Sequence, residues 1–180
     1  MIRLFAAISP PPVIIRQLST LQKGVPHARW VDPAQFHITL GFFDTVEMEK
    51  VESLDQELSR IHTPYFDLSL QSVGHFGKAT PHSLWAGLAP SAALDDLHKA
   101  VRGAARRASI HMPARQYKPH ITLAYLRSFP DISDIIKFET THNELRSDPF
   151  CVDQFHLFSV KTRSKNTNLY ICEADYPLGL

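Results

Sequence analysis

The chain has 180 residues, of which 44% are hydrophobic and 21% charged, and these proportions fit one globular domain over residues 1–180 with a core of its own. Its formal net charge of +1 argues against a general nucleic-acid coat protein, and its two cysteines are too few for a disulfide scaffold. The N-terminus begins directly as a strand, without a signal peptide or a long apolar span. We therefore expect a cytoplasmic protein that does not bind membranes.

Strands and helices alternate through the first half of the chain. Apolar residues recur at helical spacing in two segments, and Gly24 follows the first of them as a typical helix end. Alternation of apolar and polar residues predicts the strands. The predicted elements are a buried strand over 2–8, a helix over about 10–23, a strand over 35–42, a helix over 46–61 and a strand over 65–73.

The second half opens with a glycine- and proline-containing loop over 74–82 and then returns to the same pattern. Ser91 is a suitable N-cap for a helix over 92–108. The inner face of that helix holds Leu94, Leu97, Val101, Ala104 and Ala108. The other predicted elements are strands over 83–88, 119–126, 150–160 and 168–175, and a short helix or turn near 131–136. Both cysteines, Cys151 and Cys172, fall in the closing strands, so we expect buried free thiols.

One tetrapeptide occurs twice. The sequence His-Ile-Thr-Leu occupies residues 37–40 and again residues 120–123. Each copy follows a strand and a helix, and the interval from the start of that strand to the histidine is similar in the two cases. Such a chain is expected to form two related lobes, each placing one His-x-Thr strand at a shared cleft.

Side chains alternate between the two faces of a strand. In the first copy His37 and Thr39 are therefore expected on one face, and in the second copy His120 and Thr122 are expected on the equivalent face. The opposite faces hold two apolar rows, which are Phe36, Ile38, Leu40 and Phe42 in one strand and Ile121 and Leu123 in the other. Two such strands across a cleft offer two imidazoles and two hydroxyls to one small anion.

This set of side chains suits the cleavage of a phosphodiester. The reaction needs a base for the attacking oxygen and an acid for the leaving oxygen, and histidine serves as either because its ordinary pKa is near neutrality. The threonine hydroxyls can donate to non-bridging oxygens as charge develops.

A metal site is the competing interpretation of the repeated histidines. The sequence has no His-x-x-x-His or His-Glu-x-x-His pattern, and threonine is a poor metal ligand. We therefore expect no metal and no cofactor. We also expect no role for the other eight histidines, among them His75, His82 and His156.

Basic residues gather in the second half of the chain. No Asp or Glu occurs from Leu97 to Pro130, and the same stretch holds Lys99, Arg102, Arg106, Arg107, Arg115, Lys118 and Arg127. A local basic stretch of this kind can attract phosphate. The alternative is that Lys99, Arg102 and Arg106 only keep the outer face of a helix in water.

At these motifs the chain resembles the two-histidine phosphoesterase superfamily, and within it the RNA 2′,3′-cyclic phosphodiesterases that were once named 2′-5′ RNA ligases. The resemblance extends over nearly the whole length. Besides the two His-x-Thr motifs, it includes the opening strand 3–8, the segment 30–33 before the first motif, the strand 84–88 and the segment 117–119 before the second motif.

The resemblance implies an α+β class and a bilobal, pseudo-symmetric fold in which two antiparallel sheets line a central cleft and helices lie on the outside. It implies hydrolysis of a 2′,3′-cyclic phosphate at an RNA end to a 2′-phosphomonoester. In that reaction His37 is the expected general acid at the departing 3′-oxygen, and His120 is the expected general base at the attacking water, with Thr39 and Thr122 beside them. The two roles exchange in the reverse, ligating direction.

Two positions depart from the family pattern. Many members carry an arginine five residues after the second histidine, where this chain has Tyr125, and many carry a lysine after the first motif, where this chain has Gly41. We therefore expect Lys118, Tyr125 or Arg127 to bind the phosphate instead. A weaker phosphate clamp implies a different preferred RNA end or a slower enzyme.

Two other functions are open at this point. A related two-histidine esterase would act on another 2′-linked substrate, such as a 2′-5′ oligonucleotide or a small cyclic-phosphate nucleotide from RNA repair. A non-catalytic RNA-end binding protein would keep the cleft but not the reaction, although both histidines and both threonines are intact here. We expect the protein to act as a monomer.

Overall fold

The computed structural model describes residues 1–114, 116–126, 130–163 and 167–179. Four α-helices, ten strands and one short 3-10 helix lie within these ranges. In chain order they are β1 (Ile2–Ile8), α1 (Pro12–Ser19), β2 (Arg29–Trp30), η1 (Pro33–Gln35), β3 (Ile38–Val46), α2 (Met48–Ser59), β4 (Phe66–Leu68), β5 (Leu70–Phe76), β6 (Ser83–Leu88), α3 (Ala92–Arg107), β7 (His120–Tyr125), α4 (Ile132–His142), β8 (Phe150–Val152), β9 (Gln154–Arg163) and β10 (Thr167–Pro177).

Eight of the strands form one antiparallel sheet in the order β10-β9-β1-β3-β7-β6-β5, with β2 paired to β7, and β4 and β8 form a second sheet. In the large sheet β3 and β7 are joined through the residue pair Ile38 and Ile121. That junction divides the sheet into a first half (β1, β3, β9 and β10) and a second half (β2, β5, β6 and β7). The α+β class and the antiparallel sheets are confirmed, and the two sheets expected around the cleft are these two halves, connected at one point.

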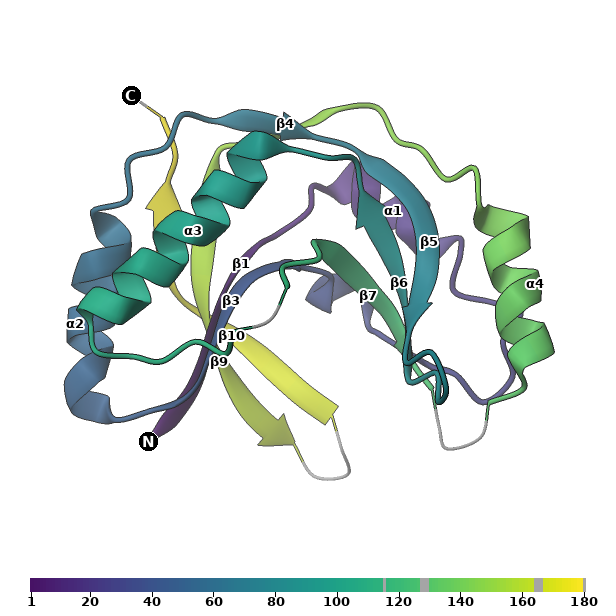
Figure 1. The fold of residues 1–180 in the computed structure, drawn as a ribbon, viewed down its shortest axis with the longest axis horizontal. Helices are drawn as coiled ribbons and strands as arrows, with labels where there is room; N and C mark the ends of the chain where they lie inside the picture. Colours follow the sequence, from purple (N-terminus) through teal and green to yellow (C-terminus); the bar gives the residue numbers. More distant parts are fainter. Residues whose placement is uncertain (115, 127–129, 164–166, 180) are drawn as a thin grey trace.

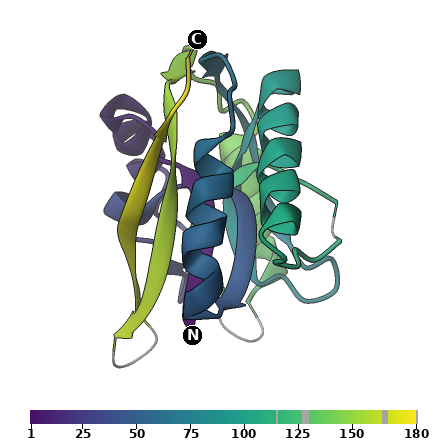
Figure 2. The same cartoon turned by 90° about the vertical axis from the view of Figure 1, so that its left-hand side faces the viewer.

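Helices α2 and α3 lie over the first half of the sheet, and α1 and α4 lie beside the second half (Figure 1). Helix α3 contacts β3 and α2, and Figure 2 shows α2 and α3 side by side over the first half. Helix α4 contacts β5, and Gln22, just after α1, donates to the backbone oxygen of Leu123 in β7. The helix that follows β1 therefore lies beside the second half, whereas the helix that follows β6 lies against the first, and this exchange ties the halves together.

Helix α3 shows why the predicted pattern holds. Ser91 accepts a hydrogen bond from the backbone N–H of Leu94, which satisfies one free donor at the start of the helix. All of the residues predicted for its inner face are buried, and they are Leu94, Leu97, Val101, Ala104 and Ala108. Burial of this row against the first half fixes the helix on the sheet.

Three elements extend beyond their predicted ends. Strand β3 continues to Val46, β5 continues to Phe76, and α4 runs from Ile132 to His142 where a short helix or turn was expected. In α4 the buried residues are Ile135 and Phe138, and the surrounding side chains are mostly polar. The prediction for α4 was too short because so narrow an apolar face gives a weak periodic signal.

A β-bulge in β3 reverses its alternation. The register between β1 and β3 shifts at two points, and the first of them along β3 leaves Leu40 without a partner in β1. Beyond it Gly41 and Phe43 are buried, whereas Phe42 is 58% exposed. The prediction that Phe42 continues the buried row of the first motif is therefore wrong.

The prediction of buried cysteines is also wrong. Cys151 and Cys172 are free thiols in strands, but both side chains are exposed. Cys151 lies in the two-stranded sheet, and Cys172 lies in β10, which is an edge strand of the large sheet, so each of these strands has a neighbour on one side only. Within the described residues, no helix has the length and apolar character needed to cross a membrane.

Candidate active site

The two His-x-Thr motifs meet at the junction of the sheet. Ile38 follows His37 and Ile121 follows His120, and these two isoleucines are the residues that pair between β3 and β7. Both isoleucines are fully buried, so Thr39, His120 and Thr122 lie on the opposite face of their strands, and His37 immediately precedes β3. Because the pairing is antiparallel and joins equivalent residues, a local two-fold axis passes through the junction and relates the two motifs.

The first histidine, His37, is held by backbone and aromatic contacts. Its Nδ1 lies 2.8 Å from the carbonyl oxygen of Gln35. The ring lies 5.0 Å from the ring of Phe5 and 5.2 Å, edge-on, from the ring of Tyr170. Since a carbonyl oxygen can only accept, Nδ1 carries the hydrogen and Nε2 is the nitrogen left for proton transfer.

The second histidine, His120, is held in the same way. Its Nδ1 lies 2.6 Å from the carbonyl oxygen of Lys118, two residues earlier, as Gln35 is two residues before His37. Its ring lies 4.8 Å from the ring of Phe76 in an edge-on contact and 6.5 Å from that of Trp85. Both imidazoles thus have the same tautomer fixed by the same local bond, which leaves two equivalent Nε2 atoms for chemistry.

Both histidines have a lowered pKa. Burial lowers the pKa of His37 from its ordinary value, the bond to the Gln35 carbonyl opposes this shift, and the charge of His120 lowers the pKa further. Burial also lowers the pKa of His120, with a smaller contribution from the positive charge of Lys118. The effect of His120 on His37 shows that the two imidazoles are close enough for a charge on His120 to disfavour protonation of His37.

The two threonines lie beside the histidines on the junction strands. Thr39 and Thr122 are half-buried. Within the described residues, neither hydroxyl has a hydrogen-bond partner. These hydroxyls are therefore available to donate to an anion that lies between the histidines.

Lys118 provides a cation beside His120. Its Nζ lies 4.3 Å from the centroid of Trp85 and 5.3 Å from that of Phe76. Lys118 is exposed, so this cation–π arrangement holds a charge at the rim of the site rather than burying it. The substrate-binding role expected for Lys118 stays a prediction.

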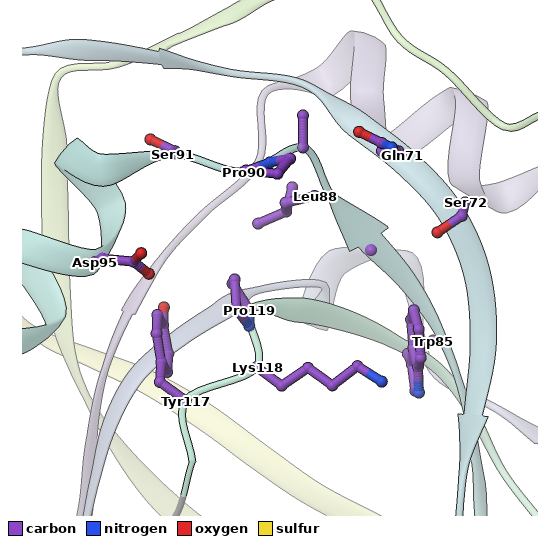
Figure 3. Close-up of a pocket in the computed structure, with 12 residues that line it drawn as sticks. Gln71, Ser72, Trp85, Leu88, Pro90, Ser91, Asp95, Tyr117, Lys118 and Pro119 are labelled. Carbon is purple, nitrogen blue, oxygen red and sulfur yellow. The ribbon is translucent and has the colours of Figure 1, made fainter.

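A pocket of about 400 Å³ adjoins this lysine (Figure 3). Trp85 and Gly87 of β6 lie opposite Thr122 and His120 of β7, so they share the face that carries the second motif. The polar lining residues are Gln71, Ser72, Ser91, Asp95 and Lys118, and Figure 3 shows the Lys118 side chain extending toward Trp85 while Asp95 lies on the side of Tyr117. The pocket therefore lies along β6, next to the face that carries His120 and Thr122.

Tyr125 lies close to Arg29 and Tyr170 beside the first motif. It is 39% exposed, and the guanidinium carbon of Arg29 lies 4.8 Å above its ring. Tyr170, which contacts His37, has its pKa raised by burial and by Tyr125, while Arg29 opposes that shift. Tyr125 of the second half thus acts on Tyr170 of the first half. The third predicted substrate-binding residue, Arg127, lies outside the described residues.

The structure explains why Gly41 departs from the family pattern. A Cβ at this position would lie 2.6 Å from Cε of Met112, because the bulge at Leu40 turns position 41 toward the core. A lysine there would meet Met112 and Val101 rather than the face of the histidines. The local backbone conformation thus accounts for a glycine at position 41 instead of the family's lysine.

Most of the predicted basic stretch does not reach the site. Lys99 forms an ion pair with Asp96 on the surface of α3, and Arg107 forms an ion pair with Glu57 of α2. Arg102 and Arg106 also belong to α3, where Arg106 is exposed. The alternative interpretation, in which the helical cations lie on a solvated face, is the one that agrees with the structure.

Sequence reasoning did not identify several residues that shape the site. Phe5, Phe76 and Tyr170 contact the histidine rings, and Arg29 lies on Tyr125. These residues come from four different strands, so no local motif connects them. The pairing of Arg29 with Tyr125 across β2 and β7 could have been found only by placing a two-residue strand correctly.

A group of possible metal ligands lies elsewhere in the molecule. Among the described residues, three His, Cys, Asp or Glu ligand atoms gather at His156, Cys172 and Asp175, and not around His37 and His120. The donors beside the two catalytic candidates are hydroxyls, aromatic rings and a lysine. The expectation that the two motifs hold no metal stays a prediction.

The comparison with protein families agrees with the repeat. A family model described as LigT like Phosphoesterase matches residues 8–85 and 88–167. Each matched segment contains one His-x-Thr motif.

Curated relatives share a name. An RNA 2′,3′-cyclic phosphodiesterase of Escherichia coli is 33% identical over 125 residues, which are 67% of this chain and 70% of that protein. One of Archaeoglobus fulgidus is 27% identical over 140 residues, which are 75% of this chain and 79% of that protein. One of Geobacillus stearothermophilus is 32% identical over 103 residues, which are 56% of this chain and 33% of that longer protein.

Solved structures share the fold along the whole chain. The apo form of E. coli LigT has a TM-score of 0.81 and 25% sequence identity, and the match covers 99% of this chain and 98% of that chain. E. coli LigT complexed with phosphate has a TM-score of 0.75 at the same 25% identity and the same coverage.

Proposed function

This chain belongs to the LigT-like phosphoesterase family, and from that premise we propose that it hydrolyses RNA ends that carry a 2′,3′-cyclic phosphate to 2′-phosphomonoesters. Its relatives in E. coli and A. fulgidus are named RNA 2′,3′-cyclic phosphodiesterases. The observation that carries the proposal is the local two-fold arrangement of His37 and His120, in which each ring is held by Nδ1 and keeps Nε2 for proton transfer.

In the proposed reaction His120 and His37 divide the proton transfers. Nε2 of neutral His120 takes a proton from the attacking water, whose oxygen forms the new bond to phosphorus. Nε2–H of charged His37 gives its proton to the departing 3′-oxygen as that P–O bond breaks. The product keeps its phosphate on the 2′-oxygen, and proton exchange with solvent restores both histidines.

The threonines and Lys118 stabilise the anion in this proposal. Thr39 and Thr122 donate their hydroxyls to the non-bridging oxygens, and the Lys118 ammonium adds positive charge beside His120. The complex of E. coli LigT with phosphate supports an anion site in this fold. Because one chain supplies every group named here, the proposed reaction needs neither a cofactor nor a second copy.

The pocket along β6 supports an RNA end over a free cyclic nucleotide. It is about 400 Å³ in volume, adjoins Lys118 and has both aromatic and polar lining. Stacking and hydrogen bonding are the usual means by which proteins hold unpaired RNA bases. We place the nucleotide that precedes the cyclic phosphate in this pocket.

The test is an assay of the purified protein with an RNA oligonucleotide that ends in a 2′,3′-cyclic phosphate. We expect a product with a 2′-phosphate, and we expect the oligonucleotide to have a higher kcat/KM than the nucleoside 2′,3′-cyclic phosphate. RNA ending in a 3′-phosphate is the matched control and should not react. A 3′-phosphate product would contradict the proposed polarity, and binding without turnover would leave only the RNA-end binding function.

The reaction is expected to continue under exhaustive chelation. The proposed acid and base are side chains, so removal of divalent ions should change kcat/KM by less than about twofold, whereas loss of a catalytic metal abolishes activity. The measurement compares turnover after dialysis against chelator with turnover after zinc or manganese is restored. Loss of activity in chelator with recovery in metal would contradict the proposed mechanism.

A further inference from the structure

Three possible metal ligands converge on the β9–β10 hairpin. His156 lies in β9, and Cys172 and Asp175 lie in β10. The distances are 2.7 Å from His156 Nδ1 to Asp175 Oδ1, 3.1 Å from Cys172 Sγ to Asp175 Oδ1, and 3.9 Å from Cys172 Sγ to His156 Nδ1. The two-histidine site uses none of these three groups.

A β-bulge in β10 creates this cluster. In a regular strand residues three apart point to opposite faces. Here the register with β9 shifts between Cys172 and Ala174, so Cys172 lies opposite Phe158 while Asp175 lies opposite His156. Because Phe158 and His156 are two residues apart in β9, they share a face, and the bulge brings Cys172 and Asp175 to that same face.

We propose that His156, Cys172 and Asp175 bind one Zn²⁺ ion through a thiolate, an imidazole nitrogen and a carboxylate oxygen. These are the three ligand types that zinc prefers, and three protein ligands leave a fourth tetrahedral position for water. The cluster combines soft and hard donors, which suits zinc better than magnesium or calcium.

The geometry is close to what zinc requires. With Zn–S of about 2.3 Å and Zn–N and Zn–O of about 2.0–2.2 Å, tetrahedral ligand atoms lie about 3.4–3.6 Å apart. The three observed separations of 2.7, 3.1 and 3.9 Å lie on both sides of that range. Each separation has to change by less than about 1 Å, which side-chain rotation can supply.

The neighbouring groups leave this ligand set intact. His156 is 8% exposed, and the protein thus holds one ligand firmly while the two ligands on the edge strand remain accessible. Glu173 lies between the two β10 ligands but accepts a hydrogen bond from Ser159, so it is engaged elsewhere. On zinc binding the Cys172 S–H bond breaks and its proton goes to solvent, while the imidazole stays neutral by carrying its hydrogen on Nε2.

The zinc is expected to act on the structure and not in the hydrolysis, because none of its three ligands belongs to the His-x-Thr motifs. A zinc ion would clamp β9 to β10, and this hairpin carries Phe158 and Tyr170. Phe158 stacks on Phe5 at 5.3 Å, and Tyr170 contacts the His37 ring at 5.2 Å. Zinc is therefore expected to stabilise the wall beside His37 without taking part in hydrolysis.

The test uses metal-free protein titrated with Zn²⁺, and with Co²⁺ as a spectroscopic probe. We expect one ion per chain by calorimetry, a melting temperature that rises with zinc concentration, and a thiolate-to-cobalt charge-transfer band in the near ultraviolet. Cys172→Ser should remove the band and weaken zinc binding by at least about tenfold. Cys151→Ser is the matched control, because it removes the other exposed cysteine and should leave both signals unchanged.

Two results would overturn the zinc site. The first is wild-type protein that binds less than one equivalent of zinc or gives no charge-transfer band. The second is equal zinc binding by the Cys172→Ser and Cys151→Ser variants, which would place the ion on other histidines. Asp175→Asn gives an independent check, since it changes an exposed carboxylate, keeps its size and should also weaken binding. Circular dichroism shows that each variant is folded, and RNA hydrolysis should be the same with and without zinc.

Discussion

Replacing either His37 or His120 by alanine is expected to lower kcat for cyclic-phosphate hydrolysis by about 10²–10⁴-fold, which is the usual contribution of one general acid or base. Each imidazole is held by its own carbonyl bond, at Gln35 or Lys118, and the alanine variants remove the only proton-transfer group that each motif offers. The measurement is steady-state turnover of RNA ending in a 2′,3′-cyclic phosphate.

The matched control is His75→Ala. His75 is also a half-buried histidine, and its Nδ1 bonds to Glu139 rather than to the motif strands. Its replacement should leave turnover within about twofold of wild type, since a residue outside the reaction contributes no proton transfer. Circular dichroism and thermal melting show whether each variant is folded.

A variant that carries both His37→Ala and His120→Ala gives a further test of this prediction. If His37 and His120 act in one transition state, removing both should cost far less than the product of the two single effects, because the remaining partner is already of little use. Near-full turnover in either single variant would show that the pair is not the catalytic machinery. Fully multiplicative losses would show that the two residues act in separate steps.

The catalytic candidates were predictable because their signal is local and duplicated. The motif at 37–40 recurs at 120–123, and strand alternation alone places each histidine and threonine on one face. The pairing of Ile38 with Ile121 could not be predicted from the sequence, because antiparallel pairing between distant segments depends on how the two halves fold together.

Other features depend on contacts that are distant in sequence. The bulge at Leu40 exposes Phe42 and buries Gly41, and nothing in the local alternation marks it. Tyr170 reaches His37 only because the closing hairpin pairs with β1. Cys172 is exposed on the edge strand β10, whereas its place in a predicted strand had suggested burial.

The pH dependence of hydrolysis is expected to be a bell that reports both histidines. The rate rises as the base loses its proton and falls as the acid loses its own. Burial lowers both pKa values from the ordinary 6.5, so the maximum of kcat/KM, which reflects the free enzyme, should lie below about pH 6.5. A bound phosphate anion favours a charged His37, so the alkaline limb of kcat should lie at higher pH than that of kcat/KM.

The pH profiles of the two single variants show which histidine gives each limb of the bell. In the proposed roles, His120→Ala removes the base and should lose the rise at low pH, whereas His37→Ala removes the acid and should lose the fall at high pH. The charge of His120 is one of the causes that lower the pKa of His37, after burial. At the pH of the alkaline limb His120 is already neutral, so its removal is not expected to shift the remaining limb to higher pH.

The measurement is kcat and kcat/KM for the wild type and both variants at constant ionic strength. The pH range runs from about 4.5 to 9, which brackets the ordinary histidine pKa. Single-turnover experiments establish that the chemical step limits the rate, since a product-release step would hide both limbs. If His37→Ala instead lost the rise at low pH and His120→Ala lost the fall at high pH, the mechanism would stand but the roles of His37 and His120 would be reversed. A flat wild-type profile with chemistry limiting would contradict the two-histidine mechanism itself, because no arrangement of one neutral and one charged imidazole can be independent of pH across their pKa values.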